Sequence, residues 1–139
     1  MLSPIFTRLA TFIATTFLNA TVEDCGKGVS MFTLNKVNLN PVNPVPGENV
    51  TLFLDYTVPT GLTVADGTAE YDVTYNYIPF TPTVEPLCQD IPCPLGPGTY
   101  QNSSVSAWPT GVSGSLDTKM KWLDSDGNLL LCVDIAAQI

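Results

Sequence analysis

Short alternating runs separated by turn residues constrain the fold of this chain most strongly. From Val29 onward, apolar or alternating stretches are broken by clusters of proline, glycine, asparagine and aspartate, and no stretch sustains a helical period. The 12 prolines and 10 glycines strengthen this turn signal. The pattern predicts an all-β domain of about seven antiparallel strands, over residues 29–39, 49–58, 68–78, 80–84, 99–108, 115–123 and 129–139.

The alternation also predicts which side chains face the interior, because successive side chains of a strand point to opposite faces of the sheet. Half-buried strands of this kind pack as a sandwich or a barrel. The inward sets are Val50, Leu52, Leu54, Tyr56 and Val58; Tyr71, Val73, Tyr75 and Tyr77; Met120 and Trp122; and Leu129, Leu131, Val133 and Ile135.

The segment Asp124 to Asn128, with the sequence DSDGN, has two interpretations. It resembles part of a calcium loop, but the third acidic ligand and the glutamate of that pattern are missing. Asp-Gly between two alternating runs is a strong signal for a β-hairpin. We therefore predict a hairpin here.

Charge and composition exclude several functions. The chain has 13 acidic and 5 basic residues and no histidine, so it lacks the basic clusters that bind nucleic acid and the commonest general base and metal ligand. A pair of carboxylates in a cleft stays open as an alternative. However, the acidic residues lie mainly at turns or opposite inward apolar residues, as on a solvated face. We predict no enzyme, no catalytic residue, no metal and no cofactor.

Residues 1–20 have the features of a secretory signal peptide. Arg8 supplies a weak positive charge, Leu9 to Leu18 an apolar stretch, and Ala20 a small residue before a plausible cleavage point. The alternative is a short buried helix; a membrane span is disfavoured because the apolar stretch is short and contains threonines. We predict a single mature domain over residues 21–139, with a net charge of −9 after the loss of Arg8, in a secreted or lumenal protein.

Four cysteines in a secreted chain predict two disulfides, for which three pairings exist. Cys88 and Cys93 are close enough in sequence to close a small loop, which leaves Cys25 to pair with Cys132. A zinc site is the alternative, but the spacings do not match paired C-x-x-C motifs. Asn49 and Asn102 begin sequons for N-glycosylation, although such triplets also arise by chance.

Short motifs follow one another in a specific order from about Glu23 to the C-terminus. They are Asp24-Cys25-Gly26, Val37-x-Leu39-x-Pro41, Pro44-x-Pro46-Gly47-Glu48-Asn49-Val50-Thr51, Leu87-Cys88, Cys93-Pro94-Leu95-x-Pro97-Gly98 and Asp126-Gly127-x-x-Leu130-x-Cys132. The series resembles the ML lipid-recognition domain family, which includes the Niemann-Pick sterol carrier, group 2 mite allergens and phosphatidylglycerol/phosphatidylinositol transfer proteins. The Pro-x-Pro-Gly-Glu-Asn segment favours the last branch. The sterol carriers have a further disulfide near positions 40–46, where this chain has asparagine and proline.

The resemblance implies an immunoglobulin-like β-sandwich of about seven strands whose sheets splay to admit a lipid. It implies the pairs Cys25 with Cys132 and Cys88 with Cys93. It also implies that inward residues line an apolar cavity instead of filling a core, with Pro79 and Phe80 near its mouth. The expected walls are Leu52, Leu54, Tyr56, Val73, Tyr75, Tyr77, Met120, Trp122, Leu131 and Val133.

The function implied by this resemblance is that of a lipid-binding or lipid-transfer protein. Its partners would be a phospholipid or a sterol and, transiently, a membrane, with no nucleic acid, and we expect a monomer. Two alternatives share the same composition. One is a structural or adhesive β-sandwich with a filled core, and the other is an accessory protein that presents lipid to a receptor.

Overall fold

The computed structural model describes residues 20–111 and 113–139, and these residues form nine strands and one short 3-10 helix. The predicted leader, residues 1–20, lies outside the described residues except for Ala20. Within the described ranges, no helix is long and apolar enough to cross a membrane. The elements are β1 (Ala20–Asp24), β2 (Thr33–Asn40), β3 (Asn49–Val58), β4 (Gly67–Tyr75), β5 (Ile78–Pro79), β6 (Thr83–Pro86), the 3-10 helix η1 (Leu87–Gln89), β7 (Gly98–Ala107), β8 (Ser115–Asp124) and β9 (Leu129–Gln138).

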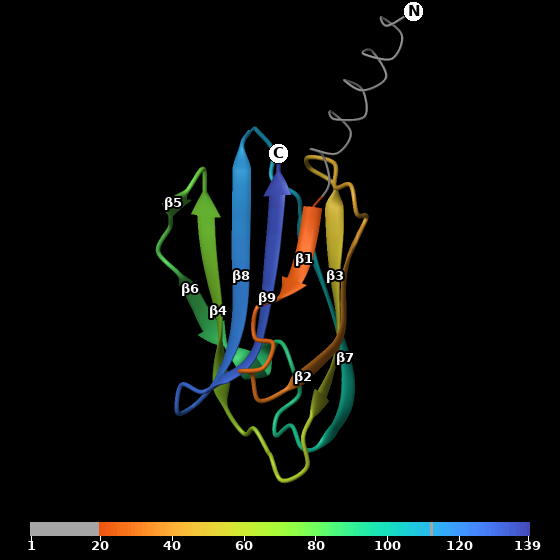
Figure 1. The fold of residues 1–139 in the computed structure, drawn as a ribbon, viewed down its shortest axis with the longest axis vertical. Helices are drawn as coiled ribbons and strands as arrows, with labels where there is room; N and C mark the ends of the chain where they lie inside the picture. Colours follow the sequence, from red (N-terminus) through yellow and green to blue (C-terminus); the bar gives the residue numbers. More distant parts are fainter. Residues whose placement is uncertain (1–19, 112) are drawn as a thin grey trace, which may run out of the picture.

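The strands form two antiparallel sheets that face each other (Figure 1). The larger sheet has the order β1-β9-β8-β4-β5, with β6 also paired to β4, and the smaller sheet has the order β2-β3-β7. This arrangement confirms the predicted all-β fold. It places β7 at one edge of the smaller sheet, and β5 and β6 at one edge of the larger sheet.

The long strands lie where alternation placed them. β3 coincides with the predicted run 49–58, and the ends of β7, β8 and β9 agree to within one residue. The predicted hairpin is confirmed, since β8 and β9 pair on either side of residues 125–128. Asp124 Oδ1 accepts hydrogen bonds from the backbone N–H groups of Asp126, at 3.0 Å, and Asn128, at 2.8 Å, which holds the turn.

The strand prediction was wrong in several places. No strand was predicted over β1, and instead of one strand over 80–84 there are two short ones, β5 and β6, on either side of residues 80–82. The first predicted run begins too early, because Val29 and Ser30 donate backbone hydrogen bonds to Gly26 in a turn and β2 starts only at Thr33. The third run extends too far. β4 ends at Tyr75, and the positive φ angles of Asn76 and Tyr77 end the alternation, so Tyr77 is 87% exposed instead of facing inward.

A closely packed core fills one end of the sandwich. Tyr56 lies at its centre, stacked on Phe32 with 5.6 Å between ring centroids and edge-on to Trp122 at 5.3 Å. Leu131 and Val133 are buried in the same cluster. The aromatic part of the core therefore lies in the half of the sandwich that contains the end of β3, and the same buried cluster continues through Leu52, Val50 and Leu39 into the other half.

Both disulfides have the pairing that the resemblance implied. Cys25, just after β1, bonds to Cys132 in β9, which joins the two ends of the described chain. Cys88 in η1 bonds to Cys93 and closes a short loop. All four cysteines are thereby oxidised.

The outer face of the larger sheet carries a crowded set of charges. Lys121 pairs with Asp72 at 3.0 Å. The pKa of Asp134 is raised to about 6, mainly by partial burial and then by the nearby carboxyl of Asp117, while Lys119 opposes the shift. Because the folded pKa lies above the unfolded value, the native state holds this proton more tightly, and stability is lost as the pH rises from about 4 to about 6.

We therefore expect Asp134→Asn to stabilise the protein at neutral pH. The amide removes the unfavourable charge, and after a discount for solvent screening the gain is about 1 kcal/mol near pH 7, with little gain near pH 4. Urea unfolding at both pH values measures this difference. Asp126→Asn, on the exposed β8–β9 turn, controls for the change in net charge, and an equal gain from Asp134→Asn at both pH values would contradict the assignment.

Candidate functional site

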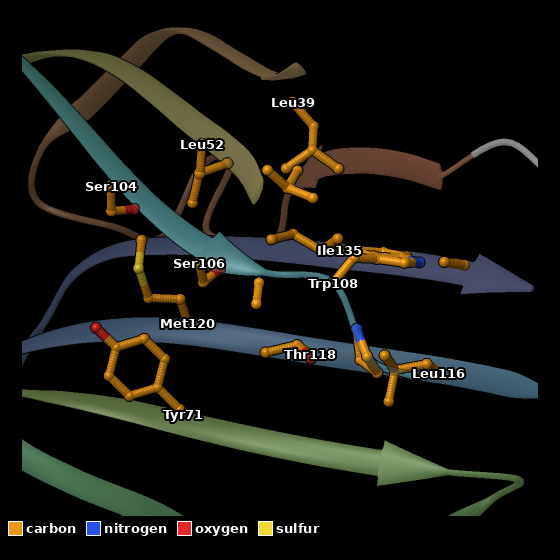
Figure 2. Close-up of a pocket in the computed structure, with 14 residues that line it drawn as sticks. Leu39, Leu52, Tyr71, Ser104, Ser106, Trp108, Leu116, Thr118, Met120 and Ile135 are labelled. Atoms are coloured by element: carbon orange, nitrogen blue, oxygen red, sulfur yellow. The ribbon is translucent and has the colours of Figure 1, made fainter. Parts of the chain in front are cut away.

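An apolar chamber lies between the sheets at the end opposite the packed core (Figure 2). Its volume is about 270 Å³, close to the lower end of the range of roughly 300–1,000 Å³ for small-molecule pockets. Both sheets and the segment after β7 contribute to its wall. The lining residues are Leu39, Val50, Leu52, Tyr71, Ser104, Ser106, Ala107, Trp108, Pro109, Leu116, Thr118, Met120, Ile135 and Ala137.

Strand register explains why these side chains meet. In the larger sheet, Thr118 pairs with Ile135 and Leu116 with Ala137, so β8 and β9 present matched positions to one face. In the smaller sheet, Leu52 pairs with both Leu39 and Ser104. The two inner faces therefore form opposite walls of the chamber (Figure 2).

The chamber opens along strand β7. Residues 103–107 of this edge strand are all exposed, although alternate side chains point to opposite faces. The inner face of β7 is therefore not covered by the larger sheet. Ser104 and Ser106 lie on this inner face, so the rim of the opening carries hydroxyl groups (Figure 2).

The segment after β7 closes the end of the chamber. The Trp108 ring lies in the wall (Figure 2). The backbone N–H of Trp108 donates to the carbonyl oxygen of Glu48 at 2.9 Å, and the backbone N–H of Gly47 donates to the carbonyl oxygen of Trp108 at 2.9 Å. Farther along, the hydroxyl of Tyr75 donates to the carbonyl oxygen of Ser113 at 2.5 Å. These bonds hold the segment against both sheets.

A second space, which we call the lateral pocket, continues from the chamber towards η1. Its volume is about 210 Å³. It shares Tyr71, Ser104 and Met120 with the chamber, so the two spaces are adjacent along one wall. The lateral pocket is lined by Leu54, Tyr71, Gln89, Asp90, Asn102, Ser103, Ser104, Met120 and Trp122.

The structure brings four of the predicted wall residues to these two spaces. Leu52 and Met120 line the chamber, and Leu54 and Trp122 line the lateral pocket, with Met120 in both. Three other predicted wall residues lie in the packed core: Tyr56, Leu131 and Val133.

The remaining predicted residues lie away from the chamber wall. Val73, Pro79 and Phe80 border a hollow that also contains residues of the charged outer face of the larger sheet. Tyr75 holds the segment after β7, and Tyr77 lies on an exposed turn. The physical reason is that β5 continues along the edge of the larger sheet, so the aromatic run passes outside the sandwich instead of between its sheets.

Sequence reasoning missed most of the wall on the open side. Ser104, Ser106 and Trp108 belong to a run in which polar residues face inward, so apolar alternation gave no signal for them. Val50 and Ile135 were assigned to the interior but not to a cavity. Alternation distinguishes inside from outside, and it does not distinguish a filled interior from an open one.

The two sequons differ in their surroundings. Asn49 is exposed at the start of β3, on the opposite face from Val50. Asn102 lies in the lateral pocket, where its Nδ2 donates to the carbonyl oxygen of Asp90 at 3.1 Å. Asn49 is therefore the more accessible of the two side chains.

Together, these features define the class of the protein. It is an antiparallel β-sandwich with a laterally open apolar chamber between its sheets, and among the described residues no group of three or more acidic or cysteine side chains is placed to hold a metal ion. A family model described as the ML domain matches residues 19–139. The chain belongs to the ML domain family, and this membership supports the prediction that the protein is not an enzyme.

Known proteins resemble the chain in sequence and in fold. A phosphatidylglycerol/phosphatidylinositol transfer protein of Mycosarcoma maydis is 29% identical over 84% of this chain, and the match covers 64% of that protein, less than two thirds of its length. A Dictyostelium discoideum protein provisionally given the same name is 28% identical, over 81% of this chain and 82% of its own.

Two solved structures share the fold. A Niemann-Pick type C2 protein from Japanese carpenter ant has a TM-score of 0.63 at 14% identity, over 86% of this chain and 98% of that one. Chicken MD-1, complexed with lipid IVa, has a TM-score of 0.55 at 11% identity, over 86% of this chain and 88% of that one. At these identities the likeness concerns the fold alone.

Proposed function

We propose that the protein binds a lipid in the chamber and transfers it between membranes. The observation that carries this proposal is the laterally open apolar chamber, in which aliphatic side chains from both sheets meet beside an uncovered edge strand. The names of the two sequence relatives, both phosphatidylglycerol/phosphatidylinositol transfer proteins, support a phospholipid as the cargo. A sterol is the alternative cargo.

The hydrophobic effect explains why a lipid needs such a carrier. Each methylene kept from water contributes about 0.8 kcal/mol, so an acyl chain of about sixteen carbons faces roughly 13 kcal/mol on its way through water. An apolar chamber offers surroundings similar to the bilayer interior. Transfer between the two is then nearly balanced in free energy and therefore reversible.

Native mass spectrometry of the non-reduced protein, followed by organic extraction, tests the proposal. A stoichiometric adduct identified as a lipid supports it and names the class of cargo. If only the ligand-free mass is found, the protein is titrated with fluorescent phospholipid and sterol. Binding of either would support the proposal, and binding of neither would favour a structural sandwich.

We further propose that the protein acts in an oxidising compartment, secreted or lumenal, as a monomer. Two disulfides and no free cysteine among the described residues support that compartment, because cytosolic reductants keep most thiols reduced. Size-exclusion chromatography with light scattering tests the monomeric state.

We expect the end of the sandwich near the chamber to contact the membrane. Three segments reach that end: 41–47 after β2, 76–82 after β4, and 108–111 after β7 (Figure 1). None of the three contains a charged residue in this acidic chain. Tyr77, Ile78 and Phe80 are exposed on the second segment. Exposed aromatic and aliphatic groups without nearby charge suit the interface of a bilayer.

We expect Ile78→Asp combined with Phe80→Asp to slow lipid transfer roughly tenfold, because charged groups oppose insertion into the interface. The measurement is fluorescent lipid transfer between phosphatidylcholine vesicles, which avoid repulsion of the acidic protein. Lipid binding in detergent-free solution should be retained, since neither side chain lines the chamber.

Val29→Asp provides the control for this experiment. Val29 is also exposed and apolar, but it lies in the turn after β1, at the opposite end of the sandwich. This variant should transfer lipid at the wild-type rate. If Val29→Asp and the double variant slowed transfer equally, the membrane contact would not lie at the chamber end.

A further inference from the structure

The lateral pocket borders a polar group that the protein itself leaves unused. The side chain of Trp122 is only 2% exposed, and its indole N–H has no hydrogen-bond acceptor among the described residues. A buried donor normally has a partner, because leaving it unpaired costs free energy. Trp122 lines the lateral pocket, so this pocket is the place from which an oxygen atom of a ligand can supply the missing acceptor.

Polar groups also line the pocket at η1 and β7. The short loop closed by the Cys88–Cys93 disulfide carries Gln89 and Asp90 into the wall. The bond from Asn102 Nδ2 to the carbonyl oxygen of Asp90, at 3.1 Å, ties this loop to β7. The disulfide and the hydrogen bond therefore fix the position of Asp90 relative to the opening.

The charge of the pocket selects among polar ligands. Its lining includes the carboxyl group of Asp90 and no lysine or arginine. Burial raises the pKa of Asp90, and the neighbouring Glu85 carboxyl adds to the shift. Glu85 also accepts a hydrogen bond from the Tyr71 hydroxyl at 3.1 Å. A phosphate group would meet negative charge without a compensating cation here, whereas a neutral hydroxyl group can donate to a carboxylate.

The position of the pocket relates it to the chamber. Tyr71, Ser104 and Met120 belong to both walls, so an elongated molecule with its apolar part in the chamber can extend its other end into the lateral pocket. The chamber is apolar and the lateral pocket is partly polar, so together they suit a lipid that has an apolar chain and a small polar head.

We propose that the lateral pocket binds a neutral, hydroxyl-bearing part of the lipid head, with any phosphate outside the pocket, the Trp122 indole N–H donating to an oxygen of that part and the Asp90 carboxylate accepting from a hydroxyl. This inference rests on the proposed function, since it presupposes an apolar chain in the chamber. The hydroxyl groups could belong to a glycerol-type head or to a sterol, and the experiment distinguishes these sources.

Two pairs of probes test the proposal by displacement of a fluorescent fatty acid. Monopalmitoylglycerol and methyl palmitate share an acyl chain and an ester but differ in hydroxyl groups; cholesterol and its methyl ether differ in the same way. We expect the hydroxyl-bearing member of at least one pair to bind about tenfold more tightly, because a site built to pair with a hydroxyl rejects the analogue that lacks it. The pair that shows the preference identifies the source.

Two variants locate the preference. Asp90→Ala and Trp122→Phe should each lower the ratio of the two affinities several-fold while methyl palmitate binds as before, whereas a purely structural effect would weaken both members of a pair. Asp126→Ala removes a carboxylate from the exposed β8–β9 turn, which does not line the lateral pocket, and should leave the ratio unchanged. Asp90 is exposed and outside the core, so Asp90→Ala should fold. This variant therefore tests whether the lateral pocket recognises the head group even if Trp122→Phe does not fold.

The outcomes that overturn the inference differ from those that overturn the proposed function. Equal affinities within both pairs, or a ratio that survives in Asp90→Ala, would show that the lateral pocket does not recognise the head, while lipid binding itself would stand. Failure of the fluorescent fatty acid, of fluorescent phospholipid and of fluorescent sterol to bind would contradict the lipid-carrier proposal and the inference together.

Discussion

Ser106→Phe is expected to lower lipid affinity at least about tenfold without loss of the fold. Ser106 lies on the inner face of β7, at the open side of the chamber (Figure 2). A phenylalanine ring there would occupy space that the lipid needs, and a loss of about 1.4 kcal/mol in binding corresponds to a factor of ten. Fluorescent lipid titration gives the affinity. The melting temperature should hold or rise, because the ring covers apolar wall and phenylalanine suits a strand.

Val105→Phe is the matched control for this substitution. Val105 is the neighbouring residue on the same strand, but it points to the opposite face and is 61% exposed. The same ring is added there without entering the chamber, so lipid should bind with wild-type affinity. If both variants bound lipid as the wild type does, the cargo would not lie beside β7.

The fold was largely predictable because most of its strands carry local signals. β3 alternates without interruption from Asn49 to Val58, and Asp126-Gly127 marks the β8–β9 turn. β1 was missed for a physical reason. It has five residues, two of them acidic, and it becomes a strand by pairing with β9, with Ala20 opposite Ala137. A strand specified by so distant a partner leaves little trace in its own sequence.

The site was less predictable than the fold. Leu52 and Met120 were assigned to a cavity wall and line the chamber, whereas Tyr56, assigned to the same wall, is surrounded by other side chains in the core. The distance between the two sheets decides whether an inward side chain packs against another side chain or faces a cavity. The sequence of a single strand does not determine that distance. The opening is marked by polar inward residues such as Ser104 and Ser106, and an alternation analysis reads such residues as solvent-facing.

The chamber and the core divide the sandwich between two tasks. The core end is held by large buried side chains such as Tyr56 and Phe32, while the chamber end is held by backbone bonds around Trp108 and by strand pairing. An open apolar space removes packing that would otherwise stabilise that end. The two disulfides therefore matter for the function, because they compensate for the packing energy that is lost at the chamber.

The Cys25–Cys132 disulfide should make the larger contribution of the two. Its cysteines are 107 residues apart, and in the chain-entropy model a loop of about one hundred residues contributes roughly 4.7 kcal/mol. Total stabilities of about 5–15 kcal/mol are usual, so we expect Cys25→Ala with Cys132→Ala to leave the protein marginally folded or unfolded at 25 °C.

Cys88→Ala with Cys93→Ala opens a loop with a separation of only 5, for which the same model gives about 2 kcal/mol. Urea unfolding followed by circular dichroism compares the two double variants. A smaller loss from the Cys25–Cys132 pair than from the Cys88–Cys93 pair would show that pairing of β1 with β9 holds the chain ends without the covalent bond.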